Sequence, residues 1–219
     1  MRGRVITLMG IDGCGKSTLS RALQAELASR GVPAVARWAT LRPVLVKPLI
    51  AAAKFLLVRK APKSVDYDAH MAAKRTGMNK LRFAHGIYFW VMALDYLPQV
   101  WWKVGVPRLL GKVVICDRYY QDLALDYAVL VNGDAARMRE ALKVLARLAP
   151  TPDLEYFVAI APEIALSRKD DVPSIAYLEE RDRFYRALAD ACAARTLRGD
   201  APVDDNCARL LRDLKLNPA

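Results

Sequence analysis

Short apolar runs alternate with longer amphipathic stretches along this chain. Residues 5–9 (Val-Ile-Thr-Leu-Met), 113–116 (Val-Val-Ile-Cys) and 153–160 are runs of strand length. After the first of them, leucines recur at every fourth position from Leu19 to Leu27. Continuous apolar strands that alternate with amphipathic helices are typical of a parallel sheet covered by helices on both faces. The pattern therefore predicts an α/β fold with three layers, α/β/α, around a mostly parallel sheet.

The remaining periodicity predicts further elements. Helices are expected over residues 17–30, 44–58, 81–102 with a kink at Pro98, 120–131, 134–149, 162–169, 175–195 and 205–214, and strands over 32–38 and 196–203. The polar stretch at 59–80 has no clear period and is expected to be irregular. Because there is no internal repeat and no low-complexity linker, we expect a single domain over residues 1–219, with a short lid at about 168–178.

A glycine-rich turn follows the first apolar run and precedes the first expected helix. Residues 10–18 read Gly-Ile-Asp-Gly-Cys-Gly-Lys-Ser-Thr, which matches G-x-x-x-x-G-K-[ST], the P-loop or Walker A motif. Glycines let successive backbone N–H groups point at phosphate oxygens, and the helix N-terminus adds positive potential. Lys16 is expected to reach the β- and γ-phosphates, and the Ser17 hydroxyl to hold Mg²⁺. The loop therefore predicts ATP binding by Gly10, Asp12, Gly13, Cys14, Gly15, Lys16, Ser17 and Thr18.

Composition narrows the setting of this loop. The 219 residues carry a formal net charge of +11, which indicates polyanionic partners such as nucleotides, nucleic acid or a membrane surface. Much of that excess lies between residues 42 and 82. The four cysteines form no C-x-x-C pair, which favours reduced thiols over a disulfide framework or a zinc site. The chain has no apolar stretch of transmembrane length and no signal peptide pattern, so we expect a cytoplasmic protein.

The expected strand at 112–117 supplies a second anchor, because it ends in Asp117 and is followed by Arg118. In a parallel sheet, ligands bind at the carboxyl ends of the strands, where the P-loop also lies. Asp117 is therefore expected close to the Mg²⁺ held by Ser17, with Arg118 directed at the same phosphates. An Asp-Arg pair after a strand can also be a helix cap with a surface charge; the nearby P-loop favours the functional interpretation.

These two blocks, residues 11–18 and 114–119, resemble thymidylate kinase and its relatives among the P-loop nucleoside monophosphate kinases. Later pieces are similar to that family as well: Pro152-Asp153-Leu154, Ala165-Leu166-Ser167-Arg168 and Phe184-Tyr185. The resemblance implies that Asp12 lies near the acceptor nucleotide. It also implies that Asp117 serves Mg²⁺ and the phosphoryl-transfer centre, and that Arg118 holds the acceptor phosphate. A family arginine after the second strand also holds that phosphate; here Arg42 is the first choice and Arg37 the second.

Transfer to a phosphate acceptor needs no strong base, because the attacking oxygen is already anionic; it needs cations. The resemblance implies a further cation from a mobile lid, since the P-loop of this chain lacks an arginine. Arg168 and Lys169 are the candidates, with Arg181 and Arg183 as alternatives. The predicted catalytic residues are Lys16, Asp117, Arg118 and Arg168, and the predicted metal ligands are Ser17 and Asp117.

The chain departs from the family where the acceptor nucleoside binds. The base-reading Phe-x-x-x-Arg element of thymidylate kinases is absent from the helix at 81–102, where Phe89 or Trp90 could still stack and Asp95 occupies the base-reading region. Asp122 stands where the family has a serine after Asp-Arg-Tyr, and Asp126 lies near it. The predicted acceptor-binding residues are Asp12, Arg42, Phe89, Trp90, Asp95, Arg118 and Asp122.

The resemblance implies an ATP- and Mg²⁺-dependent kinase for a nucleoside monophosphate, with thymidylate as the default acceptor. Two alternatives remain open. One is a P-loop kinase for another nucleotide, a nucleoside or a sugar-like alcohol, for which Asp117 or Asp12 could act as general base. The other is a nucleotide-switched protein that binds nucleic acid or a membrane surface through the basic segment 42–82. The leading hypothesis requires no nucleic acid or membrane partner. The resemblance implies a homodimer, for which the helix at 81–102 is a candidate surface.

Overall fold

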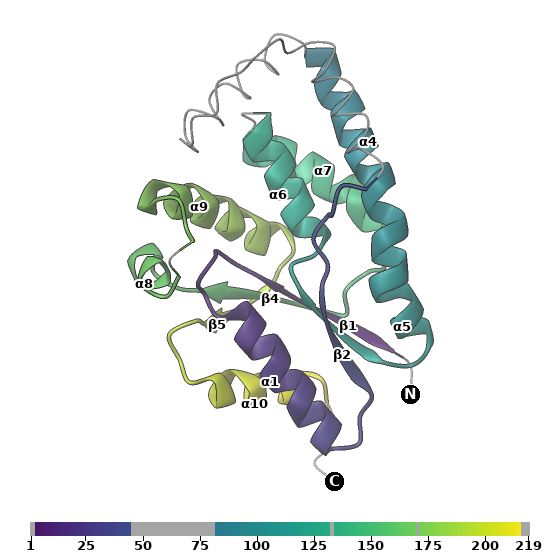
Figure 1. Cartoon of the computed structure of the whole chain (residues 1–219), viewed down its shortest axis with the longest axis vertical. Coiled ribbons are helices and arrows are strands. Elements are labelled where there is room, and N and C mark those ends of the chain that lie inside the picture. Colours follow the sequence, from purple (N-terminus) through teal and green to yellow (C-terminus); the bar gives the residue numbers. More distant parts are fainter. Residues whose placement is uncertain (1–2, 45–81, 132–133, 170, 216–219) are drawn as a thin grey trace.

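A five-stranded parallel sheet forms the centre of the computed structural model, which describes residues 3–44, 82–131, 134–169 and 171–215. The strands have the spatial order β2-β3-β1-β4-β5, and every neighbouring pair is parallel (Figure 1). Their bounds are β1 Arg4–Met9, β2 Ala34–Trp38, β3 Val113–Asp117, β4 Leu154–Ala159 and β5 Arg195–Arg198. The predicted α/β class and parallel sheet are confirmed. All carboxyl ends lie at one edge, as ligand binding there requires.

Helices cover both faces of this sheet, as the continuous apolar strands predict. On one face α1 packs against α10, and on the other α6, α7 and α9 contact one another while α4 packs on α7 (Figure 1). The helices span α1 Lys16–Ser29, α4 Arg82–Val100, α5 Val106–Leu109, α6 Tyr120–Leu130, α7 Ala135–Leu148, α8 Pro162–Ser167, α9 Ile175–Ala191 and α10 Val203–Asp213. The three-layer arrangement is therefore confirmed.

The predicted elements agree with the observed ones to within a few residues, apart from three regions. The strand expected over 196–203 is observed only over Arg195–Arg198, because a turn follows it and leads into α10. The helix expected over 81–102 ends as an α-helix at Val100 and continues as a π-helical turn, η1, over Trp101–Gly105. The wider turn follows Pro98, which lacks the N–H needed for the α-helical ladder. The expected helix at 44–58 and irregular stretch at 59–80 lie outside the described residues, apart from Val44.

The sheet's core is built from the apolar runs recognised in the sequence. Val5, Ile6 and Leu8 of β1 and the whole of β3 are buried, and the leucine stripe of α1 lies on β1, β2 and β3 with Leu23 and Leu27 fully buried. Burial of one large aliphatic side chain contributes about 1.5–3 kcal/mol. The central strands are thus the most firmly fixed part of the chain, and they carry the P-loop and Asp117 at their ends.

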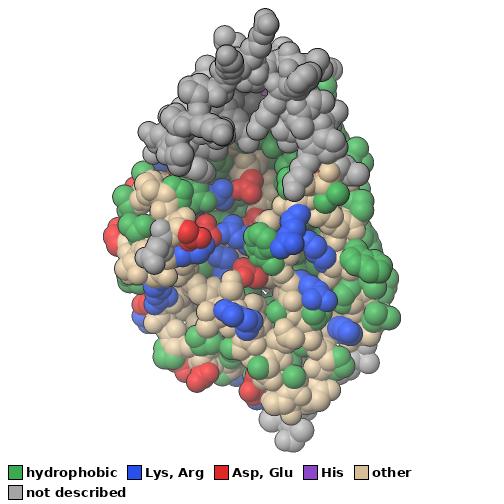
Figure 2. Space-filling view, viewed as in Figure 1, with side chains coloured by type: hydrophobic (Ala, Val, Ile, Leu, Met, Phe, Trp, Pro, Cys, Tyr) green, Lys and Arg blue, Asp and Glu red, His purple; other side chains and the backbone are tan. Residues whose placement is uncertain are grey.

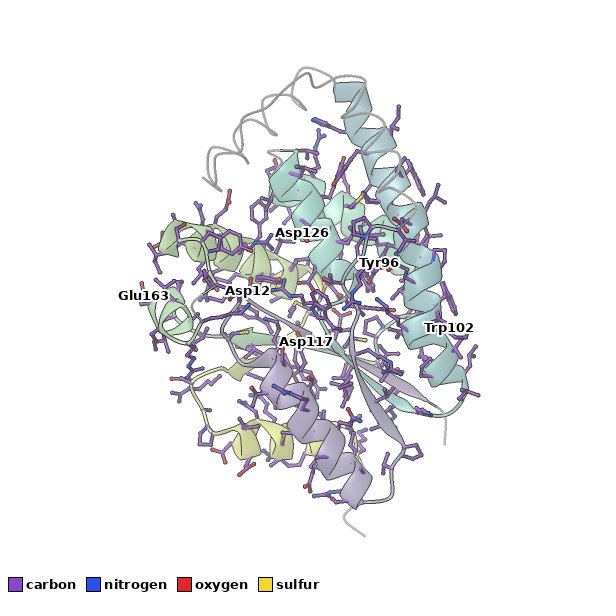
Figure 3. All side chains as sticks on the ribbon, in the orientation of Figure 1. Asp12, Tyr96, Trp102, Asp117, Asp126 and Glu163 are labelled. Atoms are coloured by element: carbon purple, nitrogen blue, oxygen red, sulfur yellow. The ribbon has the colours of Figure 1, made fainter. Side chains whose placement is uncertain are left out.

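The outer side of α4, η1 and α5 is unusually apolar. Trp90, Leu94, Trp102 and Leu109 are all exposed, and Figure 3 places Trp102 at the margin of the molecule, away from the sheet. None of the helices in the described ranges is both long enough and apolar enough to cross a membrane.

Candidate functional site

The P-loop joins β1 to α1 in a conformation that only glycine adopts easily. Gly13 and Gly15 have φ values of 84° and 97°. A Cβ on Gly13 would lie 2.3 Å from the carbonyl oxygen of Ala165, so a side chain there would collide with α8 as well. The Lys16 ammonium is buried and donates to the Gly10 and Ile11 carbonyl oxygens, both at 2.8 Å. The loop's own backbone therefore holds this cation where a phosphate chain would pass.

Ser17 and Asp117 meet across the β1–β3 neighbours, as the sequence predicts. The Ser17 hydroxyl donates directly to an Asp117 carboxylate oxygen, and Leu8 pairs with Asp117 in the sheet register. Two hard oxygen ligands side by side suit Mg²⁺, which proteins commonly hold through one or two such groups together with substrate phosphates. No group of three metal-ligating side chains occurs within the described ranges. The paired hydroxyl and carboxylate of Ser17 and Asp117 fit the oxygen ligands that a magnesium ion prefers.

Arg118 lies at the centre of a charged cluster opposite the P-loop. Its guanidinium pairs with Asp12 of the loop, lies 3.2 Å from an oxygen of Asp122, and lies 3.2 Å from the Tyr185 hydroxyl of α9. Asp122 is itself fully engaged, because it also accepts from Tyr185 and from the backbone N–H of Tyr119. Arg118 has a φ of 68°, rare for a non-glycine residue, and such conformations gather at functional sites.

The charges in this cluster stabilise one another. Burial disfavours the charge of Asp12, but Arg118, Lys16 and Lys169 outweigh it and hold the pKa of this carboxyl below its ordinary value. Burial likewise opposes the charge of Arg118, but its pKa is raised by its surroundings, which include Asp122 and Asp12. Arg118 therefore remains a cation, and its two carboxylate partners hold it in place.

A cavity of about 820 Å³ joins the P-loop to this cluster. Figure 2 shows basic and acidic side chains gathered in the hollow at the middle of the molecule, and Figure 3 places Asp12, Asp117 and Asp126 around it. Arg168 contributes to its wall from the end of α8 and donates to the Gly199 carbonyl oxygen at 2.8 Å. Lys169 lies 3.8 Å from Asp12. The lining residues are Asp12, Gly13, Cys14, Gly15, Lys16, Ser17, Thr18, Leu19, Trp38, Thr40, Asp117, Arg118, Asp126, Val158, Arg168, Lys169, Tyr177, Arg181, Gly199, Ala201, Val203 and Asn206.

Five of the residues predicted to bind the acceptor do not line this cavity. Arg42 is exposed, with its guanidinium 5.1 Å from the centre of the Trp38 ring. Asp95 is buried and accepts from the backbone N–H of Val44 at 2.8 Å. Phe89 is buried against Tyr127 at 5.1 Å between ring centres, and Trp90 is half exposed. Asp122 is buried behind Arg118. Their roles at the acceptor site stay predictions.

The cavity also brings in residues that no motif selected, together with Arg181, which the sequence analysis names as an alternative cation. Trp38 and Thr40 lie at the carboxyl end of β2 and just beyond it, the same edge of the sheet as the P-loop. Tyr177 and Arg181 lie one turn apart on α9, and that i, i+4 spacing was the available signal. Gly199 begins the turn after β5, and Asn206 lies in the first turn of α10. A motif search detects runs of neighbouring residues, so it misses cavity residues that come singly from different helices, strands and turns.

With the geometry established, comparison with known proteins gives a consistent result. The chain is 26% identical over 213 residues to a protein of Teredinibacter turnerae, which covers 92% of this chain and 91% of that protein. It is 29% identical over 170 residues to a protein of Methanosarcina barkeri (77% and 70% covered) and to one of Synechococcus sp. (77% and 72%). The likeness is to thymidylate kinases. The Methanosarcina protein is named a probable thymidylate kinase and the other two thymidylate kinases, whereas no family model matches the chain.

Proposed function

We propose that this protein is a nucleoside monophosphate kinase of the thymidylate kinase type, in which ATP and Mg²⁺ serve phosphoryl transfer to a small phosphorylated acceptor. The observation that carries the proposal is the shared cavity of Lys16 and Arg118. One cation belongs to a P-loop and the other stands opposite it, beside Asp12. A site for transfer between two phosphates needs two such anion-binding centres within one enclosure.

Each residue then has a role that follows from its place. The loop amides and Lys16 hold the β- and γ-phosphates of ATP, and Arg118 holds the acceptor phosphate. Mg²⁺, held by Ser17 and Asp117, supplies charge neutralisation at the transferring group. Arg168, at the edge of the cavity, is the cation that closes on the donor side. No general base is needed, because the attacking phosphate oxygen is already anionic.

The relatives' names suggest thymidylate as the acceptor, and it remains the default. The test is a panel of nucleoside monophosphates, nucleosides and sugar alcohols offered with ATP and Mg²⁺ to the purified protein, with ADP release as the readout. We expect at least one monophosphate to stimulate turnover at least about tenfold over the ATP-only rate. Stimulation by an alcohol alone, with every monophosphate silent, would replace the proposal by the alternative of a kinase for an unphosphorylated acceptor.

The family resemblance also implies a homodimer, and the exposed apolar side of α4, η1 and α5 supports that part of the proposal. Large apolar patches on a monomer commonly mark interaction surfaces. Light scattering coupled to size exclusion should give twice the chain mass for the natural protein and a single mass for Leu94→Glu. Equal masses for the two proteins would show that the apolar side of α4, η1 and α5 is not a dimer interface.

A further inference from the structure

Two buried residues that do not line the cavity hold the guanidinium of Arg118. Its Nη1 lies 3.2 Å from Asp122 Oδ1 and 3.2 Å from the Tyr185 hydroxyl, and that hydroxyl donates in turn to the same carboxylate oxygen. The three groups therefore form a closed triangle of hydrogen bonds. Asp122 is 1% exposed, Tyr185 is fully buried, and neither belongs to the wall of the cavity. The two residues can affect a ligand only through Arg118.

Both partners of Arg118 in this triangle are themselves fixed. The second carboxylate oxygen of Asp122 accepts from the backbone N–H of Tyr119 at 3.0 Å, at the start of α6. Tyr185 lies on α9, and burial together with the nearby Asp122 raises the pKa of its hydroxyl well above the ordinary value. The phenol therefore keeps its proton and remains a donor to Asp122. Two helices packed against each other thus define the position of Nη1.

These contacts leave a defined part of the guanidinium for a ligand. A guanidinium has five N–H donors, two on each Nη and one on Nε. Asp122 and Tyr185 take both donors of Nη1, and Asp12 takes one of Nη2. The Arg118 side chain makes no other hydrogen bond within the described ranges, so Nε and Nη2 each keep one N–H. Arginine commonly binds a phosphate through two hydrogen bonds from neighbouring nitrogens.

A guanidinium that is already fixed binds a phosphate more tightly than a mobile one. An arginine that becomes immobilised only on binding loses rotamer freedom, which weakens binding by about twofold to tenfold. The triangle restricts Arg118 before any ligand arrives. The φ of 68° at Arg118 is consistent with this, because a rare backbone conformation persists only where the surrounding contacts determine it.

We infer that Tyr185 and Asp122 are positioning residues, which hold Nη1 of Arg118 so that its Nε and Nη2 receive the acceptor phosphate. The inference rests on the proposed function and adds two residues to its acceptor side. It gives Asp122, which stands where the family has a serine, a role without contact to the acceptor. It also gives a role to Tyr185, which belongs to no phosphate-binding motif.

The main variant is Tyr185→Phe, which removes one hydroxyl and keeps the buried ring. The matched control is Tyr156→Phe in β4. Tyr156 is equally buried, and its hydroxyl also donates to a carboxylate, that of Asp213, at 2.6 Å. Tyr156 does not line the cavity. The two variants therefore lose the same kind of hydrogen bond, but only one of them loses it beside Arg118.

Steady-state kinetics measures the effect on each substrate separately. The acceptor is dTMP, the default, or the monophosphate with the highest turnover in the acceptor panel. For Tyr185→Phe we expect the KM for the acceptor to rise about threefold to tenfold, with the KM for ATP unchanged. For Tyr156→Phe we expect both KM values to equal those of the natural protein. A merely structural role of the Tyr185 hydroxyl would lower the melting temperature without separating the two KM values.

NMR of the arginine side chain gives a second readout that needs no acceptor. In ¹⁵N-labelled protein, the Nη–H groups of a guanidinium give separate resonances when hydrogen bonds stop its rotation, and Arg118→Lys identifies those of Arg118. We expect these resonances in the natural protein and in Tyr156→Phe, and their loss through exchange broadening in Tyr185→Phe. Asp122→Asn should lose them too, because an amide has only one acceptor oxygen for the N–H groups of Tyr119 and Arg118.

An unchanged acceptor KM in Tyr185→Phe, or Arg118 resonances as sharp as in the natural protein, would overturn the inference and leave the kinase proposal standing. An equal rise in the KM for ATP would overturn it as well, because the effect would then not be confined to the acceptor side. Absence of turnover with every monophosphate would instead remove the proposed function, and this inference with it.

Discussion

The two halves of the cavity are built in different ways. The half assigned to the donor is one unbroken stretch of the P-loop, Asp12 to Thr18, completed by Asp117 at the end of the neighbouring strand. The acceptor half is assembled from the end of β2, from α6, from the link between α8 and α9, and from α9 itself. In the proposed function the donor half would bind mainly through backbone amides, whereas the acceptor half would bind through side chains.

That difference teaches where sequence motifs are reliable. A loop that holds phosphate with its backbone must keep its glycines and its spacing, because the required φ values are closed to other residues. Recognition by side chains requires only that a suitable functional group lies at the right position, and any neighbouring helix, strand or loop can supply it. Arg118 is shared by both halves, since it pairs with Asp12 of the loop and with Asp122 of α6.

The largest expected effect comes from breaking the donor half. Lys16→Ala should lower kcat/KM by about a thousandfold or more, which is about 4 kcal/mol of transition-state stabilisation, because the main cation at the transferring phosphate is lost. Steady-state kinetics beside a circular-dichroism melt would measure both activity and folding. Near-normal kcat/KM would remove the P-loop from the chemistry.

Arg118→Ala tests the residue that joins the halves. We expect kcat/KM for the acceptor to fall about a hundredfold while the KM for ATP changes little, because the guanidinium holds only the acceptor phosphate. The change also leaves Asp122 buried without its cation, so we expect a lower melting temperature than that of the natural protein. Arg118→Lys keeps a charge and serves as the comparison; equal activity in all three proteins would contradict the assignment.

Arg168→Ala should have a smaller effect, about ten- to a hundredfold in kcat, because Arg168 lies at the exposed edge of the cavity. Its hydrogen bond to Gly199 is the contact that must open for the arginine to reach a phosphate. Arg183→Ala, on the exposed side of α9, is the matched control and should retain full turnover. A larger loss of kcat in Arg183→Ala than in Arg168→Ala would indicate that Arg183, and not Arg168, is the cation on the donor side.

Asp95→Ala separates a structural role from acceptor binding. Asp95 is 3% exposed and accepts from Val44 and from Gln99, so its loss should destabilise the protein by about 1–3 kcal/mol. Urea denaturation would measure that change, with Asp95→Asn as the milder comparison. If Asp95 binds the acceptor as the sequence predicts, the Asp95→Ala variant should have a higher KM for the acceptor and an unchanged free energy of unfolding.

The smallest effect concerns pH. The pKa of Asp12 is lower in the folded protein than its ordinary value of about 3.9, so its charge stabilises the fold above about pH 4, and that contribution is lost as the pH falls through the folded value. The stability difference between the natural protein and Asp12→Asn should therefore shrink below about pH 4. Thermal melts from pH 3 to pH 6 would show it; a constant difference would mean that Asp12 is not held by Arg118.

Much of the fold follows from pattern alone. Three local patterns predict β1, β3, β4 and α1. Apolar runs of strand length indicate the three strands, and the glycine loop followed by leucines at every fourth position indicates α1. The π-helical turn at Trp101–Gly105 was not predicted, because it depends on how the chain repacks after Pro98. A sequence shows that Asp95 is polar, but not that its carboxylate accepts a hydrogen bond from the backbone N–H of Val44. Its role at the acceptor stays a prediction.

The sequence by itself determined the parallel α/β class and the phosphate loop, because hydrophobic periodicity and glycine positions are local signals. It also indicated that Ser17 and Asp117 meet, because both follow strands whose carboxyl ends share one edge of a parallel sheet. Only the tertiary structure decided which side chains line the cavity beside the P-loop. In the folded chain the buried Asp122 accepts a hydrogen bond from Tyr185, and Asp95 accepts one from the backbone N–H of Val44. Arg181 of α9 likewise donates to Asp126 of α6. Contacts between residues 55 positions apart depend on how helices pack, and packing has no local signature in the chain.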